Sequence, residues 1–191
     1  ERPAPSFPSM SDPLVVQLAY TYPSVLVSDA DGRLYAVDAV MGTLQWRAQA
    51  GRGALGTPAI LDVHANEGRE IVTVSDAGDI TVLDATGDVL SRAMLPIGRY
   101  VPRPLVADID GDDTLELIVA EENWQVVIAS LDGLVKERVP LRGAAREGLV
   151  LGDVQGDGLL ELLVATDCAR LHCFETAARD GWIHPRGFDA P

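Results

Sequence analysis

Carboxylate side chains gather in one short stretch of this sequence, alternating with small or neutral residues. Asp108, Asp110 and Asp112 hold the first, third and fifth positions, and Glu116 holds the ninth. Calcium takes about six to eight oxygen ligands, which several carboxylates and a backbone carbonyl on one tight loop can supply. With the carbonyl of Thr114 at the seventh position, the segment predicts a structural calcium site.

A second segment with the same spacing begins 45 residues later. Gln155 stands where the middle aspartate would be, so one of its ligands is a neutral oxygen. A calcium site is predicted here too, with fewer charges to hold the ion. Its candidate ligands are Asp153, Gln155, Asp157, the carbonyl of Leu159, and Glu161.

A third and weaker candidate consists of Asp62, Asn66 and Glu70, which offer only two carboxylates. A structural turn is the better interpretation there. The same alternative applies to all three segments, because aspartates and glycines form tight turns in which Asp side chains accept backbone N–H groups. An EF-hand is a poor match, because the closing Glu opens an apolar strand and not a helix.

Motifs for catalysis are missing from the sequence. It has no Gly-x-Ser-x-Gly elbow, no His-Glu-x-x-His pair and no Walker loop. Cys168, His172 and Cys173 resemble part of a zinc site, but a closed site needs four ligands. We therefore expect a non-catalytic protein.

The charge balance narrows the class of partner. Against 29 acidic residues stand 15 basic ones, giving a net charge of −14, which repels a phosphate backbone. No apolar run approaches the roughly 20 residues that cross a bilayer. Nucleic acid and a membrane span within this chain are therefore not expected, and a protein or glycan is the expected partner.

The candidate loops recur because the whole sequence is repetitive. The apolar runs 70–74, 116–120 and 161–165 each follow one of the three segments, at spacings of 46 and 45 residues. A fourth copy, around Val25 to Asp29, lies one period upstream and lacks the acidic segment. A period of this length is typical of repeat architectures.

Each copy contains four short apolar runs separated by Gly, Asp or Asn, which predict strands. Sheets that are apolar on both faces must pack against a neighbour on each side. We therefore predict an all-β protein, a β-propeller of four four-stranded antiparallel blades, either a complete ring or part of a larger one. The predicted blades cover approximately 14–50, 57–95, 103–141 and 147–185.

The acidic segments resemble the loops of FG-GAP or VCBS repeats, which occur in integrin α-subunit propellers and many secreted bacterial proteins. The first copy, from Ser28 to Trp46, is similar to the blade repeat of pyrroloquinoline-quinone (PQQ) dehydrogenases and their non-catalytic relatives. That second resemblance implies that Trp46 packs between blades. The Phe-Gly and Gly-Ala-Pro motifs of the integrin-type repeat are absent from their usual places.

The resemblance implies a calcium-binding module for adhesion, binding or scaffolding. Its expected location is extracellular or periplasmic, or in the ectodomain of a membrane protein. Two alternatives stay open. One is a fragment of a quinoprotein-like or polysaccharide-acting enzyme. The other is a structural part of a large assembly, whose partner would be the remaining blades of a larger propeller.

Overall fold

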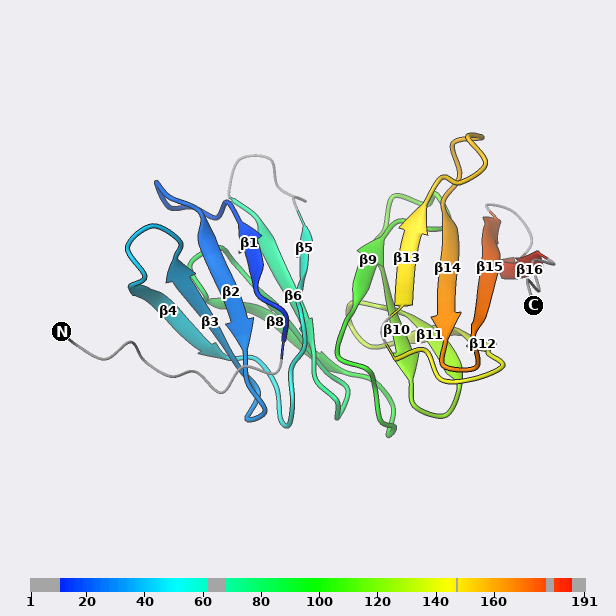
Figure 1. The fold of residues 1–191 in the computed structure, drawn as a ribbon, viewed down its shortest axis with the longest axis horizontal. Helices are drawn as coiled ribbons and strands as arrows, with labels where there is room; N and C mark the ends of the chain where they lie inside the picture. The colour runs from blue at the N-terminus through cyan, green and yellow to red at the C-terminus, as the bar shows by residue number, and fades with distance from the viewer. Residues whose placement is uncertain (1–10, 62–67, 147, 178–180, 187–191) are drawn as a thin grey trace.

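The computed structural model describes residues 11–61, 68–146, 148–177 and 181–186 (Figure 1). Within these ranges the chain forms sixteen strands and no helix. None of the described segments is therefore a helix that could cross a membrane. The strands form four separate four-stranded antiparallel sheets, each made from consecutive strands of the chain.

The sheets are called blades 1 to 4 in chain order. Blade 1 contains β1 (Leu14–Val16), β2 (Ser24–Ser28), β3 (Arg33–Asp38) and β4 (Leu44–Gln49). Blade 2 contains β5 (Ala59–Leu61), β6 (Glu70–Val74), β7 (Asp79–Leu83) and β8 (Val89–Met94). Blade 3 contains β9 (Leu105–Ala107), β10 (Glu116–Glu121), β11 (Gln125–Ser130) and β12 (Val135–Pro140). Blade 4 contains β13 (Gly148–Gly152), β14 (Glu161–Thr166), β15 (Arg170–Ala177) and β16 (Gly181–Arg186).

The central strands of blade 3 are apolar on both faces, as the sequence predicts. In β10, Leu117 and Val119 belong to the core shared with blade 2, whereas Ile118 and Ala120 belong to the core shared with blade 4. All four are at most 1% exposed. Side chains alternate across a strand, so a continuous apolar run supplies two cores at once.

Three hydrophobic clusters among the described residues lie between consecutive blades. One joins blades 1 and 2, with Leu26 packed in the same cluster as Ile71. The next joins blades 2 and 3, and the last joins blades 3 and 4 through residues such as Ile128 and Leu162. The four blades therefore stack in chain order, each leaning on its neighbours.

Trp46 lies at the junction of the first two blades. Its indole Nε1 donates a hydrogen bond to the carbonyl of Ala85, at 3.1 Å. A Cβ added to Gly87, whose φ is +87°, would lie 2.6 Å from the indole ring. The glycine therefore provides both the left-handed turn and the space for the ring. The predicted packing of Trp46 between blades is confirmed.

Candidate metal site in the loop after β9

The loop between β9 and β10 is organised by one carboxylate. Asp108 Oδ1 accepts hydrogen bonds from the N–H groups of Gly111 and Asp112, and its Oδ2 accepts one from Asp113. Positive φ values at Gly111 and Asp113 complete the turn. The capping role that the turn interpretation gives to aspartate is therefore present, and it leaves the carboxylates further along the loop for other partners.

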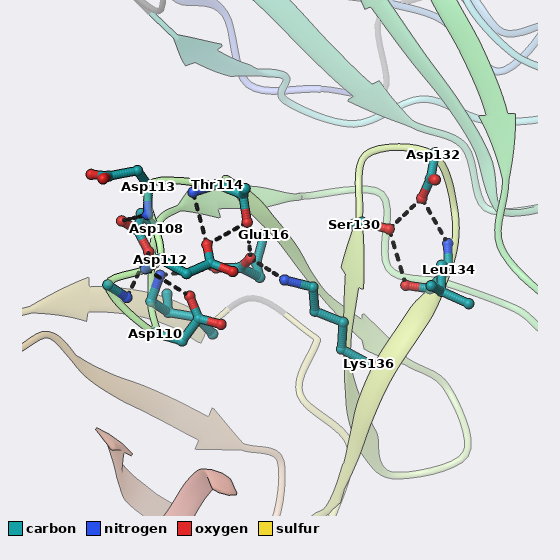
Figure 2. A network of polar contacts seen from close by, with 12 residues as sticks. Asp108, Asp110, Asp112, Asp113, Thr114, Glu116, Ser130, Asp132, Leu134 and Lys136 are labelled. Atoms are coloured by element: carbon teal, nitrogen blue, oxygen red, sulfur yellow. Dashed lines mark hydrogen bonds and ion pairs between the residues drawn. The ribbon is translucent and has the colours of Figure 1, made fainter. Parts of the chain in front are cut away.

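Glu116 closes the loop from the first position of β10, where it is fully buried. Its Oε2 accepts a hydrogen bond from the N–H of Ile109, at 3.0 Å. Its Oε1 lies 2.6 Å from the ammonium of Lys136, which reaches across from β12 (Figure 2). The buried carboxylate is thus held by one backbone donor and one cation.

Three carboxylates converge at this point. Ligand atoms of Asp108, Asp110 and Glu116 all lie within 4.8 Å of one another. The carboxylate of Asp112 instead accepts hydrogen bonds from the N–H and hydroxyl of Thr114. Thr114 also directs its hydroxyl to Glu116, at 3.3 Å. A small cation placed among the three carboxylates would find oxygen ligands on several sides.

The electrostatics of the cluster reflect uncompensated negative charge. Burial, and next the charge of Glu116, raises the pKa of Asp110 above its ordinary value. Burial opposes the charged form of Lys136, but the hydrogen bond and charge of Glu116 outweigh it and raise the pKa of the ammonium. The hydrogen bond from the Thr114 hydroxyl lowers the pKa of Asp112. One ammonium therefore faces three clustered carboxylates, a balance that favours a further cation.

The loop between β13 and β14, which projects from one end of blade 4 in Figure 1, has the same backbone design. Asp153 accepts hydrogen bonds from the N–H groups of Gly156, Asp157 and Gly158. These bonds, led by that from Gly158, lower the pKa of Asp153. As in the first loop, the closing glutamate, Glu161, accepts the N–H of the second loop residue, at 2.7 Å.

The side chains of this second loop are paired differently. Gln155 donates from Nε2 to Glu161 Oε1 at 2.8 Å and to Glu175 Oε1 at 3.2 Å. Asp157 accepts the N–H of Leu159, at 3.0 Å. The amide of Gln155 thus does for Glu161 what the ammonium of Lys136 does for Glu116. Within the described residues, converging carboxylates are found in the first loop and not in the second.

The sequence contains two further sets of candidate metal ligands. Asp62 and Asn66 lie outside the described residues, whereas Glu70 begins β6 as a buried residue. In the zinc alternative, His172 and Cys173 are neighbours in β15, so their side chains point to opposite faces of the sheet. The His172 ring stacks on Phe174, which faces the core shared with blade 3.

Lys136 and Glu175 take part in these two loops although the sequence spacing did not predict them. Lys136 lies 20 residues after Glu116, and only the folded β12 brings it near. Glu175 lies directly across from Glu161 in the register of β14 and β15. One signal for Lys136 was available, because it is the only lysine among the 191 residues.

A groove runs along the first strands of the four blades. Its volume is about 580 Å³, and β1, β5, β9 and β13 all contribute to its lining. Leu14, Ile60 and Leu149 supply aliphatic surface, while Arg103 pairs with Asp12, which is also in the lining, and Arg146 pairs with Asp167. Because the first strand of every blade contributes to its lining, the groove is a candidate surface for a ligand of moderate size.

Three solved structures resemble this chain in fold, at sequence identities of 12% to 18%. No family model matches the chain, and a search of curated proteins found no match. The chain is similar to the Vibrio cholerae biofilm matrix protein Bap1 (TM-score 0.64, 18% identity), covering 94% of this chain and 31% of that one. It is also similar to BBS1N in its complex with ARL6DN (TM-score 0.62, 12% identity), covering 90% and 55%.

A third similar structure is BamB from Moraxella catarrhalis (TM-score 0.53, 16% identity), covering 80% of this chain and 42% of that one. The fold is a β-propeller. Its four four-stranded blades confirm the fold class predicted from the repeats. The chain spans between 31% and 55% of the length of these three structures. The finer resemblance to FG-GAP, VCBS or PQQ repeats stays a prediction.

Proposed function

We propose that this chain is a non-catalytic propeller module that binds or scaffolds a protein or glycan partner, with the loop 108–116 stabilised by calcium. The observation that carries the calcium proposal is the convergence of Asp108, Asp110 and Glu116 within 4.8 Å. The groove along the first strands of the blades is the proposed contact surface, because its aliphatic lining, bordered by the ion pairs Arg103–Asp12 and Arg146–Asp167, suits an amphipathic partner segment.

The proposed location follows from the strength expected of such a loop. Sites of this open kind in extracellular modules bind calcium with dissociation constants of about 10⁻⁴ to 10⁻³ M. They fill only where free calcium reaches the millimolar range, outside the cytosol. An extracellular or periplasmic setting, or the ectodomain of a membrane protein, is therefore proposed. The similarity to a biofilm matrix protein supports this setting at the level of the fold.

Exchanging the middle residue of the two acidic loops tests the calcium proposal directly. With a dissociation constant of about 1 mM, about 10 mM calcium should stabilise the wild-type chain by about 1.4 kcal/mol. Asp110→Asn is expected to abolish this effect, because it removes a carboxylate that the cation needs. Gln155→Asp is expected to create a second site beside Glu161 and Glu175. Thermal unfolding and isothermal titration calorimetry measure the stabilisation and the stoichiometry.

Asp31→Asn is a suitable control, because Asp31 lies in blade 1, far along the chain from both loops, and pairs with Arg33 on the surface. It should leave the response to calcium unchanged. A wild-type chain whose unfolding is identical in calcium and in chelator would contradict the calcium proposal. Magnesium at the same concentration separates a specific effect from ionic strength.

A further inference from the structure

In blades 2 and 3, the sheet face that packs against the following blade is buried. In blade 3 this face consists of Ile118, Ala120, Val126 and Ile128, each at most 1% exposed. They pack against residues of blade 4 such as Leu162. In blade 2 the corresponding face includes Val72 and Ile80. It belongs to the core shared with blade 3, and these two side chains are also at most 1% exposed.

The same face of blade 4 is open. Its residues lie 45 positions after those of blade 3, and they are aliphatic or sulfur-containing in the same way: Leu163, Ala165, Leu171 and Cys173, with Val150 beside them on β13. Yet Val150 is 57% exposed and Leu171 is 46% exposed. In the described part of the chain, no hydrophobic cluster joins this face to another sheet.

Blade 1 has the complementary open face, the one that would look toward a preceding blade. Val25, Val27 and Val37 are partly exposed there and Val15 is 65% exposed, whereas Tyr35, opposite Val27 on the same face, is buried. The residues in the matching positions of blade 3, such as Leu117 and Val119, are completely buried against blade 2. Blades 1 and 4 thus carry one partly exposed apolar face each. The two faces are of the two kinds that meet at the internal junctions of the stack.

A polar contact of the junction between blades 1 and 2 has no counterpart at this face. In blade 2, Arg92 on β8 lies opposite Thr81 and donates a hydrogen bond to the carbonyl of Gln49 in blade 1, at 2.6 Å. At the equivalent position of blade 3, Arg138 pairs instead with Glu121 of its own blade. Arg47 lies opposite Tyr35 in the same register of blade 1. The side chain of Arg47 makes no hydrogen bond or ion pair with any residue that the structure describes. Arg47 is therefore placed to reach the outermost strand of a preceding blade.

We propose that two copies of this chain associate head to tail, with the open face of blade 4 in one copy packed against the open face of blade 1 in the other. The contact continues the interface that already joins blades 1, 2, 3 and 4 in the same register. Used twice around a two-fold axis, it closes a ring of eight blades, which lies within the range of known propellers. The proposal depends on neither the calcium site nor the groove.

A second copy is favoured as the occupant because both halves of the required interface are present on this chain. Each open face matches, in its apolar character, the type of surface that the other would meet in the stack. A closed ring also removes the solvent contact of large side chains on both faces, whereas an isolated arc leaves them in water.

Sedimentation velocity and light scattering over a concentration series test the association. The wild-type chain is expected to show twice its 20.4 kDa mass. Leu171→Glu in blade 4 and Val15→Glu in blade 1 are each expected to give the single-copy mass, because each places a charge in both interfaces of the ring. Ile97→Glu, at a fully exposed position in the connection between β8 and β9, serves as the control and should remain a dimer.

Mixing the two interface variants distinguishes a head-to-tail contact from other dimers. The unaltered blade 1 face of Leu171→Glu and the unaltered blade 4 face of Val15→Glu form one intact interface, so the mixture is expected to recover a heterodimer. Circular dichroism confirms that each variant remains folded. A wild-type chain that keeps the single-copy mass throughout the series would overturn the proposal, and so would a dimer that persists in both variants.

Discussion

Replacing Asp29 with alanine is expected to lower the free energy of unfolding by about 4 kcal/mol, because it removes several hydrogen bonds to one buried carboxylate. Asp29 is 1% exposed. Its Oδ1 accepts the N–H groups of Asp31 and Arg33, both at 2.9 Å. Its Oδ2 accepts the hydroxyl of Tyr35, at 2.8 Å. Alanine would leave these donors without their acceptor, and the Tyr35 hydroxyl would lose it in a buried contact.

Asp29 also joins two blades through its backbone. Its carbonyl accepts the N–H of Leu55, which lies in the connection that leads from blade 1 to blade 2. Loss of the carboxylate therefore loosens the hairpin that presents this carbonyl. Urea unfolding followed by fluorescence and circular dichroism measures the change. Asp38→Ala is a matched control, because Asp38 accepts backbone N–H groups in an exposed turn and should cost far less.

The conservative variant Asp29→Asn separates the turn from the charge. The Asn oxygen still accepts the two backbone N–H groups, and its amide faces the Tyr35 hydroxyl, so a loss of about 1 kcal/mol is expected. An Asp29→Ala chain as stable as Asp29→Asn would contradict the role given to the carboxylate.

The same carboxylate contributes to acid sensitivity. Burial alone would raise the pKa of Asp29, but the hydrogen bonds from the Arg33 N–H and the Tyr35 hydroxyl outweigh it and lower the pKa below its ordinary value. A depressed folded pKa stabilises the fold fully above the unfolded pKa of about 4, and that stability is lost as the pH falls through the folded value. Asp29→Asn should therefore flatten the pH dependence of stability in the acid range only.

Lys136→Met is expected to destabilise the calcium-free chain by about 3 kcal/mol, because it leaves the buried carboxylate of Glu116 without its cation. The Lys136 side chain is 20% exposed and the Glu116 side chain is fully buried, so solvent replaces little of the lost charge. Calcium should restore part of this stability, and more in this variant than in the wild type, since the competing ammonium is gone. Chemical unfolding in chelator and in calcium measures both effects.

A double variant shows whether the two residues act as a pair. Lys136→Met combined with Glu116→Gln removes both charges, and Gln can still accept the N–H of Ile109. The combined loss is expected to be smaller than the sum of the two single losses. Equal stability of Lys136→Met and the wild type in chelator would show that the pair contributes nothing.

The architecture could be predicted because it depends on local patterns that repeat. A run such as Leu117 to Ala120 has no polar face, so it requires a partner on each side whatever the rest of the chain does. Recurrence of that requirement at even spacing leaves stacked sheets as the natural solution. The acidic loops were equally local, since Asp108 and Glu116 lie only eight positions apart and share one turn.

The residues that complete each site could not be predicted, because the pairing of neighbouring strands brings them to the loops. Their spacing along the sequence does not reveal this pairing. Lys136 approaches Glu116 across the paired strands β10, β11 and β12, at the bulge where Lys136 itself has no partner in the ladder. Gln155 could be recognised as a weaker ligand, but its role as a donor to Glu161 and Glu175 depends on the pairing of β14 with β15. Asp29 has no role predicted from the sequence, and its backbone bond to Leu55 joins blade 1 to the connection that leads to blade 2.

Among the described residues, each hydrophobic cluster joins two consecutive blades, and this has an evolutionary consequence. A gene duplication that adds one whole repeat at any of the three internal junctions would present the new sheet with the surfaces it was already shaped to meet. The apolar faces that meet at the junctions would not have to be redesigned. Such a chain can grow or shrink by whole repeats while its acidic loops diverge one copy at a time, as those of blades 3 and 4 already have.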